Sequence, residues 1–137
     1  MWGTVNLLDG TTEFMHLAGQ LKEPAFEVER EDWQLYPEAR RLRMDLLEEE
    51  YIEYTSSEIA DDLVGVVDGL LDIIVIAWGS LLTYIGEEKA KAAAAEVLRS
   101  NLSKVDGSLG PIRRRGDGKI LKPEGWTPPD IKGVLRG

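Results

Sequence analysis

The apolar stretch from Leu63 to Ile85 constrains the fold more than any other feature of this chain. It is apolar on nearly every side and ends at Gly86, a residue suited to a helix C-terminus. Such a helix is either a membrane span or the centre of a packed bundle. Its uninterrupted part, 73–85, is short for a span, and Asp68 and Asp72 would each cost about 2.5–3.5 kcal/mol near a bilayer centre. The stretch therefore predicts the central helix of a bundle, with part of its surface covered by another subunit.

The remaining helices follow from caps and periodicity. Apolar residues recur at helical spacing after Pro37, and an alanine-rich segment follows Gly86. Together these patterns predict an all-α, four-helix-bundle-like fold that is oligomeric. The expected helices are one capped by Thr11-Thr12 and running to Leu21, one from Pro37 to about Thr55, one capped by Ser56-Ser57 and running from about Glu58 to Ile85, and one from about Glu87 to Val105.

The C-terminal part has a different residue pattern. Turn signals crowd residues 106–118, and Asp117-Gly118 predicts a hairpin between two basic segments. Residues 1–110 carry 9 Lys and Arg against 22 Asp and Glu, whereas residues 111–137 carry 7 against 3. We expect a helical domain over 1–110 and a basic tail over 111–137 that packs on it. Residues 22–36 look irregular.

Composition excludes several classes of protein. The chain has no Cys and one His, His16, so thiolate and histidine-rich metal sites are excluded. The acidic body disfavours binding to nucleic acid. Met1-Trp2-Gly3 lacks the pattern of a signal peptide. We therefore expect a cytoplasmic protein that binds neither nucleic acid nor membrane.

Two acidic clusters carry the chemistry. Glu50 and Glu53 share one helical face, as do Asp68 and Asp72 on the next helix. No Lys or Arg lies between Arg43 and Lys89 to pair with them. Antiparallel packing of the two helices would bring the clusters together. Oxygen ligands with surplus negative charge suit Mg²⁺, with Mn²⁺ as a possible substitute.

An interpretation without a metal site stays open for part of this pattern. A run such as Glu48-Glu49-Glu50 is in most proteins a solvated helix face. Asp68 and Asp72 are harder to explain in that way, because their neighbours are almost all apolar and a buried carboxylate needs a partner. Taken together, the two clusters favour a metal site.

Several segments resemble a known family. The stretch 46–53, LLEEEYIE, is similar to the LLxEExxE signature of the MazG-like all-α nucleotide pyrophosphohydrolases. The stretch 68–74, DGLLDII, resembles their second acidic signature, and 96–104, EVLRSNLSK, resembles their EVxRSNxSK stretch. Residues 119–122 and 128–130 fit the tail of the phage-type members. The resemblance covers most of the chain.

The resemblance implies a homodimer or homotetramer of helical bundles, in the host cytoplasm if phage-encoded. It implies Mg²⁺-dependent hydrolysis of a nucleoside triphosphate to the monophosphate and pyrophosphate. Glu50 and Glu53 match the family's ExxE metal ligands, and Asp72 matches the last residue of its ExxD motif. Gly69 stands where that motif has its first Glu, and Asp68 is the expected substitute. Glu49 is expected as a further ligand or as the residue that orients the attacking water.

The same resemblance assigns substrate contacts after the fourth helix. Asn101 and Lys104 correspond to its sugar-side and phosphate contacts, and Arg99 is a further phosphate candidate. Trp33, Trp78 and Trp126 are candidates for stacking on a base, although Trp78 is favoured as core or subunit interface.

The motifs leave the function open in two respects. One alternative is a non-catalytic nucleotide-binding or protein-interaction module that kept the helical fold. Another is a hydrolase that acts on a phosphoribosyl nucleotide or an alarmone. The metal site contacts only the phosphates, so these residues do not identify the nucleotide.

Overall fold

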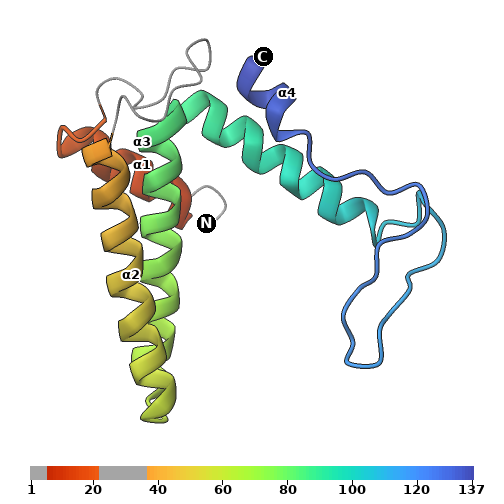
Figure 1. The fold of residues 1–137 in the computed structure, drawn as a ribbon, viewed down its shortest axis with the longest axis horizontal. Helices are drawn as coiled ribbons and strands as arrows, with labels where there is room; N and C mark the ends of the chain where they lie inside the picture. Colours follow the sequence, from red (N-terminus) through yellow and green to blue (C-terminus); the bar gives the residue numbers. More distant parts are fainter. Residues whose placement is uncertain (1–5, 22–36) are drawn as a thin grey trace. The chain divides into compact units, whose positions relative to one another are not determined.

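The computed structural model describes residues 6–21 and 37–137, and it is helical throughout its regular parts (Figure 1). Within these residues there is no strand, which confirms the all-α prediction. Residues 22–36, expected to be irregular, and Trp33 lie outside the described part. The helices are α1 (Leu7–Leu17), α2 (Pro37–Ile59), α3 (Leu63–Ser103) and α4 (Ile131–Arg136).

Helix α3 is bent at Gly86. This residue has φ 82° and ψ 166°, a conformation that glycine adopts readily and other residues avoid. Gly86 therefore interrupts the helix at the position where the sequence predicted a helix end. The helix resumes after Gly86, and α3 continues to Ser103. The bend also divides the chain into two compact units, Met1–Glu87 and Glu88–Gly137, which are described separately below.

Helix α1 begins earlier than predicted. Asn6 is its N-cap: the Asn6 side chain accepts from the Asp9 backbone N–H at 2.9 Å and donates to the Asp9 carboxylate at 2.8 Å. Thr11 and Thr12 therefore lie inside the helix, where their hydroxyls donate to carbonyls one turn back. The prediction that they cap the helix is wrong, because Asn6 makes both halves of a reciprocal cap.

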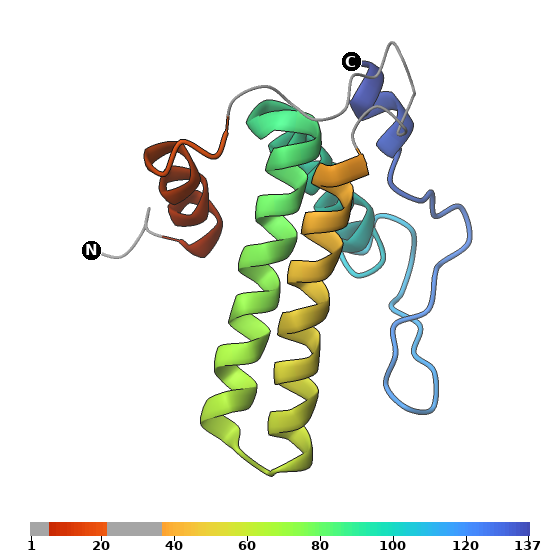
Figure 2. The same ribbon diagram turned by 60° about the vertical axis from the view of Figure 1, so that its left-hand side comes forward.

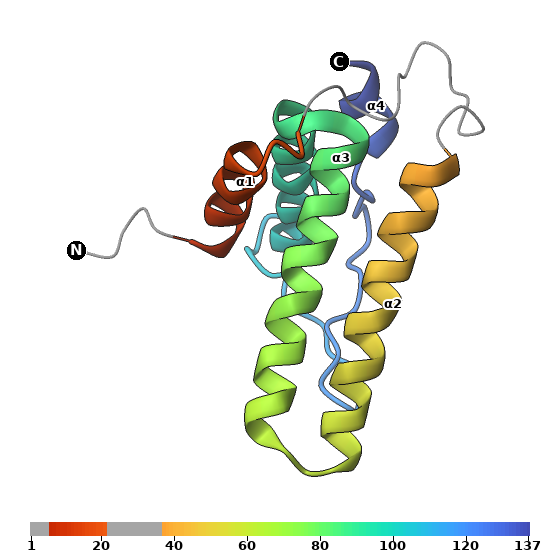
Figure 3. The ribbon, with the colours of Figure 1, turned by 90° about the vertical axis from the view of Figure 1, so that its left-hand side faces the viewer.

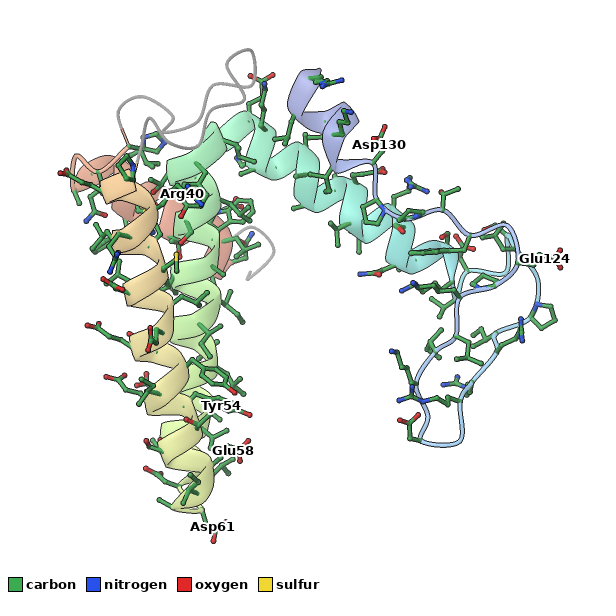
Figure 4. All side chains as sticks on the ribbon, viewed as in Figure 1. Arg40, Tyr54, Glu58, Asp61, Glu124 and Asp130 are labelled. Carbon is green, nitrogen blue, oxygen red and sulfur yellow. The ribbon has the colours of Figure 1, made fainter. Side chains whose placement is uncertain are left out.

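Helix α2 is also longer than predicted, and α3 starts later. Ser56 and Ser57 belong to α2, so they do not cap the next helix as expected. The cap is Asp62, whose carboxylate accepts from the Gly65 N–H at 3.1 Å. Asp61, with φ 53°, makes the turn between the helices at the far end of the pair (Figure 4).

Helix α2 and the first part of α3 run antiparallel side by side (Figures 2 and 3). Three glycines of α3 face α2 at close range, Gly69 against the Tyr54 backbone and the other two against side chains. A Cβ at Gly69 would lie 3.0 Å from Tyr54 Cα, and a Cβ at Gly79 would lie 2.7 Å from Arg43 Nη2. Gly65 meets Ser57 in the same way. The contacts move toward the start of α2 as they move toward the end of α3, so all three fit one antiparallel register.

Helix α1 is fixed to α3 by a buried polar contact. Trp78 is 6% exposed, and its indole N–H donates to Thr12 Oγ1 at 2.9 Å. Met15 and Leu82 complete the buried core of the first unit. Trp78 is therefore a core residue, as the sequence favoured.

The second unit consists of the end of α3 and the tail that returns along it. Ser100 is fully buried: its hydroxyl donates to the Thr127 carbonyl at 2.9 Å, and its carbonyl accepts from the Trp126 indole N–H at 2.8 Å. The Asp130 N–H, at the start of α4, donates to Glu96 at 2.6 Å (Figure 4). Ala90 and Ala93 are buried here because their small side chains permit close packing.

The predicted turn at Asp117-Gly118 is confirmed. Arg115 N–H donates to the Lys119 carbonyl, and Leu121 N–H donates to the Arg113 carbonyl, both at 2.8 Å. A single bridge pairs Arg114 with Ile120. The basic tail thus forms a short antiparallel turn.

The α2–α3 pair leaves a large apolar surface uncovered. No residue of α2 is buried, and α3 is long and apolar enough to cross a membrane by length and composition, a test that core helices of soluble proteins also pass. Aliphatic and aromatic side chains on both helices are 40–80% exposed. They include Leu42, Leu47, Tyr51, Ile52, Val64, Val67, Leu70, Leu71 and Ile74.

Candidate metal centre

Three carboxylates of the first unit converge between α2 and α3. One oxygen from each of Glu50, Glu53 and Asp72 lies within 4.8 Å of the others. Glu50 and Asp72 are half-buried, whereas Glu53 is exposed. Helix α2 contributes Glu50 and Glu53, and the first part of α3 contributes Asp72 from the opposite helix of the antiparallel pair.

The convergence follows from helix geometry. Glu50 and Glu53 are three residues apart, so both project from the same face of α2. The register fixed by the glycine contacts places Asp72 opposite Glu50, between the Gly69 and Gly79 contact points. The antiparallel arrangement expected from the sequence is therefore the one that brings Asp72, but not Asp68, to Glu50 and Glu53.

Glu50 is the most perturbed member of the group. Burial, followed by the nearby charges of Asp72 and Glu53, raises the pKa of Glu50 to about 6. Its Oε2 atom is buried and has no hydrogen-bond partner. The two neighbouring carboxylates can satisfy that oxygen only when one of the three carries a proton.

This donor set fits a divalent cation. A buried carboxylate oxygen without a donor is costly, and a cation removes both the missing contact and the mutual repulsion. The donors are carboxylate oxygens, which are the ligands that Mg²⁺ and Mn²⁺ prefer. Mg²⁺ usually takes one or two carboxylates and keeps several waters, so a group of three suffices.

The other acidic candidates lie outside this group. Asp68 is exposed and is not among the three converging carboxylates. Glu49 is exposed on α2 beside Glu50. Gly69 is buried against the Tyr54 backbone, which leaves no room for a side chain. The ligand role of Asp68 and the role of Glu49 stay predictions.

The predicted substrate-binding residues all belong to the second unit. Arg99 forms an ion pair with Glu96, with Nε 2.7 Å from Oε1, and this pair lowers the pKa of Glu96 to about 2. Lys104 Nζ lies 3.3 Å from Asn101 Oδ1 and 4.9 Å from the centre of the Trp126 ring. Arg99 is therefore engaged in a helix-surface ion pair, whereas the partners of Lys104 among the described residues are neutral.

One cation at this place was missed by sequence reasoning. Lys122 Nζ also lies 4.9 Å from the centre of the Trp126 ring, so two lysines share one indole. Lys104 directly follows the end of α3, whereas Lys122 lies in the returning tail. Only the return of the tail along α3 brings them together, and no local pattern signals that.

Comparison with protein-family models and with curated protein sequences finds no match to this chain.

Proposed function

We propose that this chain is a Mg²⁺-dependent nucleotide pyrophosphohydrolase of the MazG-like type, which cleaves a nucleoside triphosphate to the monophosphate and pyrophosphate. The observation that carries the proposal is the convergence of Glu50, Glu53 and Asp72 around a buried oxygen without a donor. Motif resemblance supplies the reaction, and the geometry supports the use of these residues as a cation site.

The residues have distinct tasks in this proposal. Glu50, Glu53 and Asp72 would hold the cation, with Asp68 as a further ligand. When bound, Mg²⁺ supplies charge neutralisation at the phosphoryl oxygens and lowers the pKa of a coordinated water. Glu49, exposed next to Glu50, would be a further ligand or would orient the attacking water. Arg99, Asn101 and Lys104 stay the substrate-binding candidates, Lys104 as a compact cation for a phosphate oxygen.

The acidity of the first unit supports the need for a cation. Residues 1–87 carry 5 Lys and Arg against 19 Asp and Glu. A nucleoside triphosphate is itself strongly anionic, so this unit would repel it unless metal ions neutralise part of the charge. The proposal therefore predicts that substrate binding depends on the divalent cation.

The exposed apolar surface supports assembly into a homodimer or homotetramer. Exposed side chains on α2 and α3 form a larger apolar surface than monomeric proteins usually keep. In a bundle of several chains these faces would cover each other, and α3 would be a central bundle helix and not a membrane span. A cytoplasmic location is part of the same proposal.

One experiment tests the reaction. The purified protein is incubated with Mg²⁺ and a panel of ribo- and deoxyribonucleoside triphosphates, and pyrophosphate and orthophosphate are measured separately. We expect pyrophosphate with at least one nucleotide and none when EDTA replaces Mg²⁺. No pyrophosphate from any nucleotide would favour a binding module, and orthophosphate alone would indicate cleavage of a different bond.

Variants connect the reaction to the site. Glu53→Gln and Asp72→Asn should abolish turnover while the helical content stays unchanged, because each replaces a ligand by a neutral amide of the same shape. Glu48→Gln is the matched control, since Glu48 is exposed on the same helix and outside the group. Full turnover in either ligand variant would show that the assignment is wrong.

A further inference from the structure

A charged side chain lies at the α2–α3 interface close to the carboxylates but outside their group. The half-buried guanidinium of Arg43 donates from Nε to Ser80 Oγ at 2.9 Å and from Nη2 to the Ile76 carbonyl at 3.1 Å. Burial lowers the pKa of Arg43, although the group remains charged at neutral pH. No carboxylate of the described residues forms an ion pair with it. A half-buried charge whose partners among the described residues are neutral is costly, so its position calls for an explanation.

The surroundings of Arg43 are shaped to receive it. A Cβ at Gly79 would lie 2.7 Å from Arg43 Nη2 and 3.0 Å from Met15 Sδ, so the guanidinium occupies space next to a glycine that a larger residue would have to share. The Ser80 hydroxyl donates to the Ile76 carbonyl at 2.7 Å, which therefore accepts from both side chains. Helices α1, α2 and α3 all meet at this point.

The contact has a fixed relation to the carboxylates. Arg43 precedes Glu50 by two helical turns, about 10 Å of helix. Ile76 follows Asp72 by one turn. A slip of α2 against α3 by one residue would move each side chain about 1.5 Å along the axis and about 100° around it. Such a slip would separate oxygens that now lie within 4.8 Å of each other.

The Gly65 and Gly69 contacts limit how the two helices can shift, but the remaining contacts of the pair resist a slip only weakly. Most side chains between and around the helices are apolar and partly exposed, and apolar burial has no preferred direction. A guanidinium fork on one carbonyl and one hydroxyl is directional and is lost when either acceptor moves. Mutual repulsion within the acidic group pushes the helices apart at the point where the alignment matters.

We propose that Arg43 is a positioning residue: its fork on Ile76 and Ser80 sets the register of α2 against α3 that brings Glu50 and Glu53 to Asp72. The inference rests on the proposed function, since it concerns the same cation site. It adds a residue outside the acidic motifs whose loss should weaken cation binding without removing any ligand.

The test is a Mn²⁺ titration of the full chain followed by electron paramagnetic resonance of the free ion. In Arg43→Gln we expect the dissociation constant to rise roughly 10-fold or more, the usual effect of removing a group that orients metal ligands. Arg43→Lys keeps the charge but loses the fork, so its affinity should also fall. Wild-type affinity in Arg43→Lys would show that charge alone matters and would overturn the proposal.

Two control variants separate positioning from general effects. Arg41→Gln makes the same charge change two residues away at an exposed site. Thr12→Val removes the buried Trp78 contact and destabilises the same unit without touching α2. Both should bind Mn²⁺ as the wild type does. Equal weakening in Thr12→Val would mean that stability, and not register, controls affinity, and the proposal would fail.

The outcomes also distinguish this inference from the proposed function. A wild-type chain that binds no Mn²⁺ contradicts the proposed function itself. A wild type that binds and an Arg43→Gln variant that binds equally well contradict only the role of Arg43. If Arg43→Gln lacks helical circular dichroism, Arg43→Lys and Ser80→Ala decide, and wild-type affinity in both would overturn the proposal.

Discussion

Replacing Glu50 by glutamine should stabilise the metal-free protein, although it removes a charged residue from the proposed cation site. The reason is the environment of Glu50, where burial and two neighbouring carboxylates raise its pKa to about 6. A raised carboxylate pKa means that the charged form of this side chain lowers the free energy of unfolding. Glutamine keeps the shape of the side chain and removes that cost.

The magnitude follows from the shift. A rise from 4.5 to about 6 corresponds to at most about 2 kcal/mol at neutral pH. Solvent reaches part of this group, and screening reduces the figure to about 1 kcal/mol. For a unit of this size, about 1 kcal/mol corresponds to a melting-temperature change of roughly 4–8 °C.

The sign with pH is opposite to that of a salt-bridged carboxylate. Above pH 6 the folded protein bears the full cost of the charged Glu50. As the pH falls from about 6 to about 4.5, the folded state takes up a proton before the unfolded state does, and the cost disappears. The advantage of Glu50→Gln should therefore be largest near about pH 7.5 and fall to less than half of that near about pH 5.

The assay is thermal unfolding in EDTA, followed by circular dichroism, at those two pH values. Glu48→Gln, exposed on the same helix, is the control and should melt like the wild type at both. Added Mg²⁺ should raise the wild-type melting temperature and leave Glu50→Gln almost unchanged, since ligand binding stabilises only the state that binds. A variant no more stable than the wild type in EDTA at the higher pH would refute the reasoning.

Other substitutions probe the remaining features of the structure. Gly69→Ala should lower the melting temperature, because overpacking against the α2 backbone costs about 1–3 kcal/mol. Gly10→Ala, in a helix with open space around it, should raise the melting temperature by the ordinary alanine preference. Asp68→Asn should weaken Mn²⁺ binding less than Asp72→Asn does, by titration, since only Asp72 is in the converging group. Ser100→Ala removes the hydrogen bond to the Thr127 carbonyl and should speed proteolysis within residues 111–130.

Sequence patterns predicted the helices well and their ends poorly. The apolar helical segments and the interruption at Gly86 could be predicted, because both depend on local residue types. The starts of α1 and α3 were misplaced, since Thr, Ser, Asn and Asp all cap helices and the pattern offers several of them. Asn6 and Asp62 are the caps because their side chains reach a backbone N–H in the first turn.

The candidate site shows the same division between local and distant information. Glu50 and Glu53 are paired by their spacing, and Asp72 could be predicted to face them from the antiparallel connection. The contributions of Arg43 and Lys122 could not be predicted, because each depends on a contact between segments distant in sequence. No local pattern distinguishes Arg43 from the exposed Arg41.

The displaced acid at the second motif has a structural explanation. Residue 69 faces α2 and contacts the Tyr54 backbone, so an acidic side chain there would separate the helices that carry the other ligands. On a helix, residue 68 projects about 40° from the direction of residue 72, and residue 69 about 60° on the other side. Glycine at 69 thus permits the close approach that brings Glu50 to Asp72, whereas the exposed Asp68 lies outside the converging group. The departure from the motif and the tight helix pair are therefore two consequences of one packing arrangement.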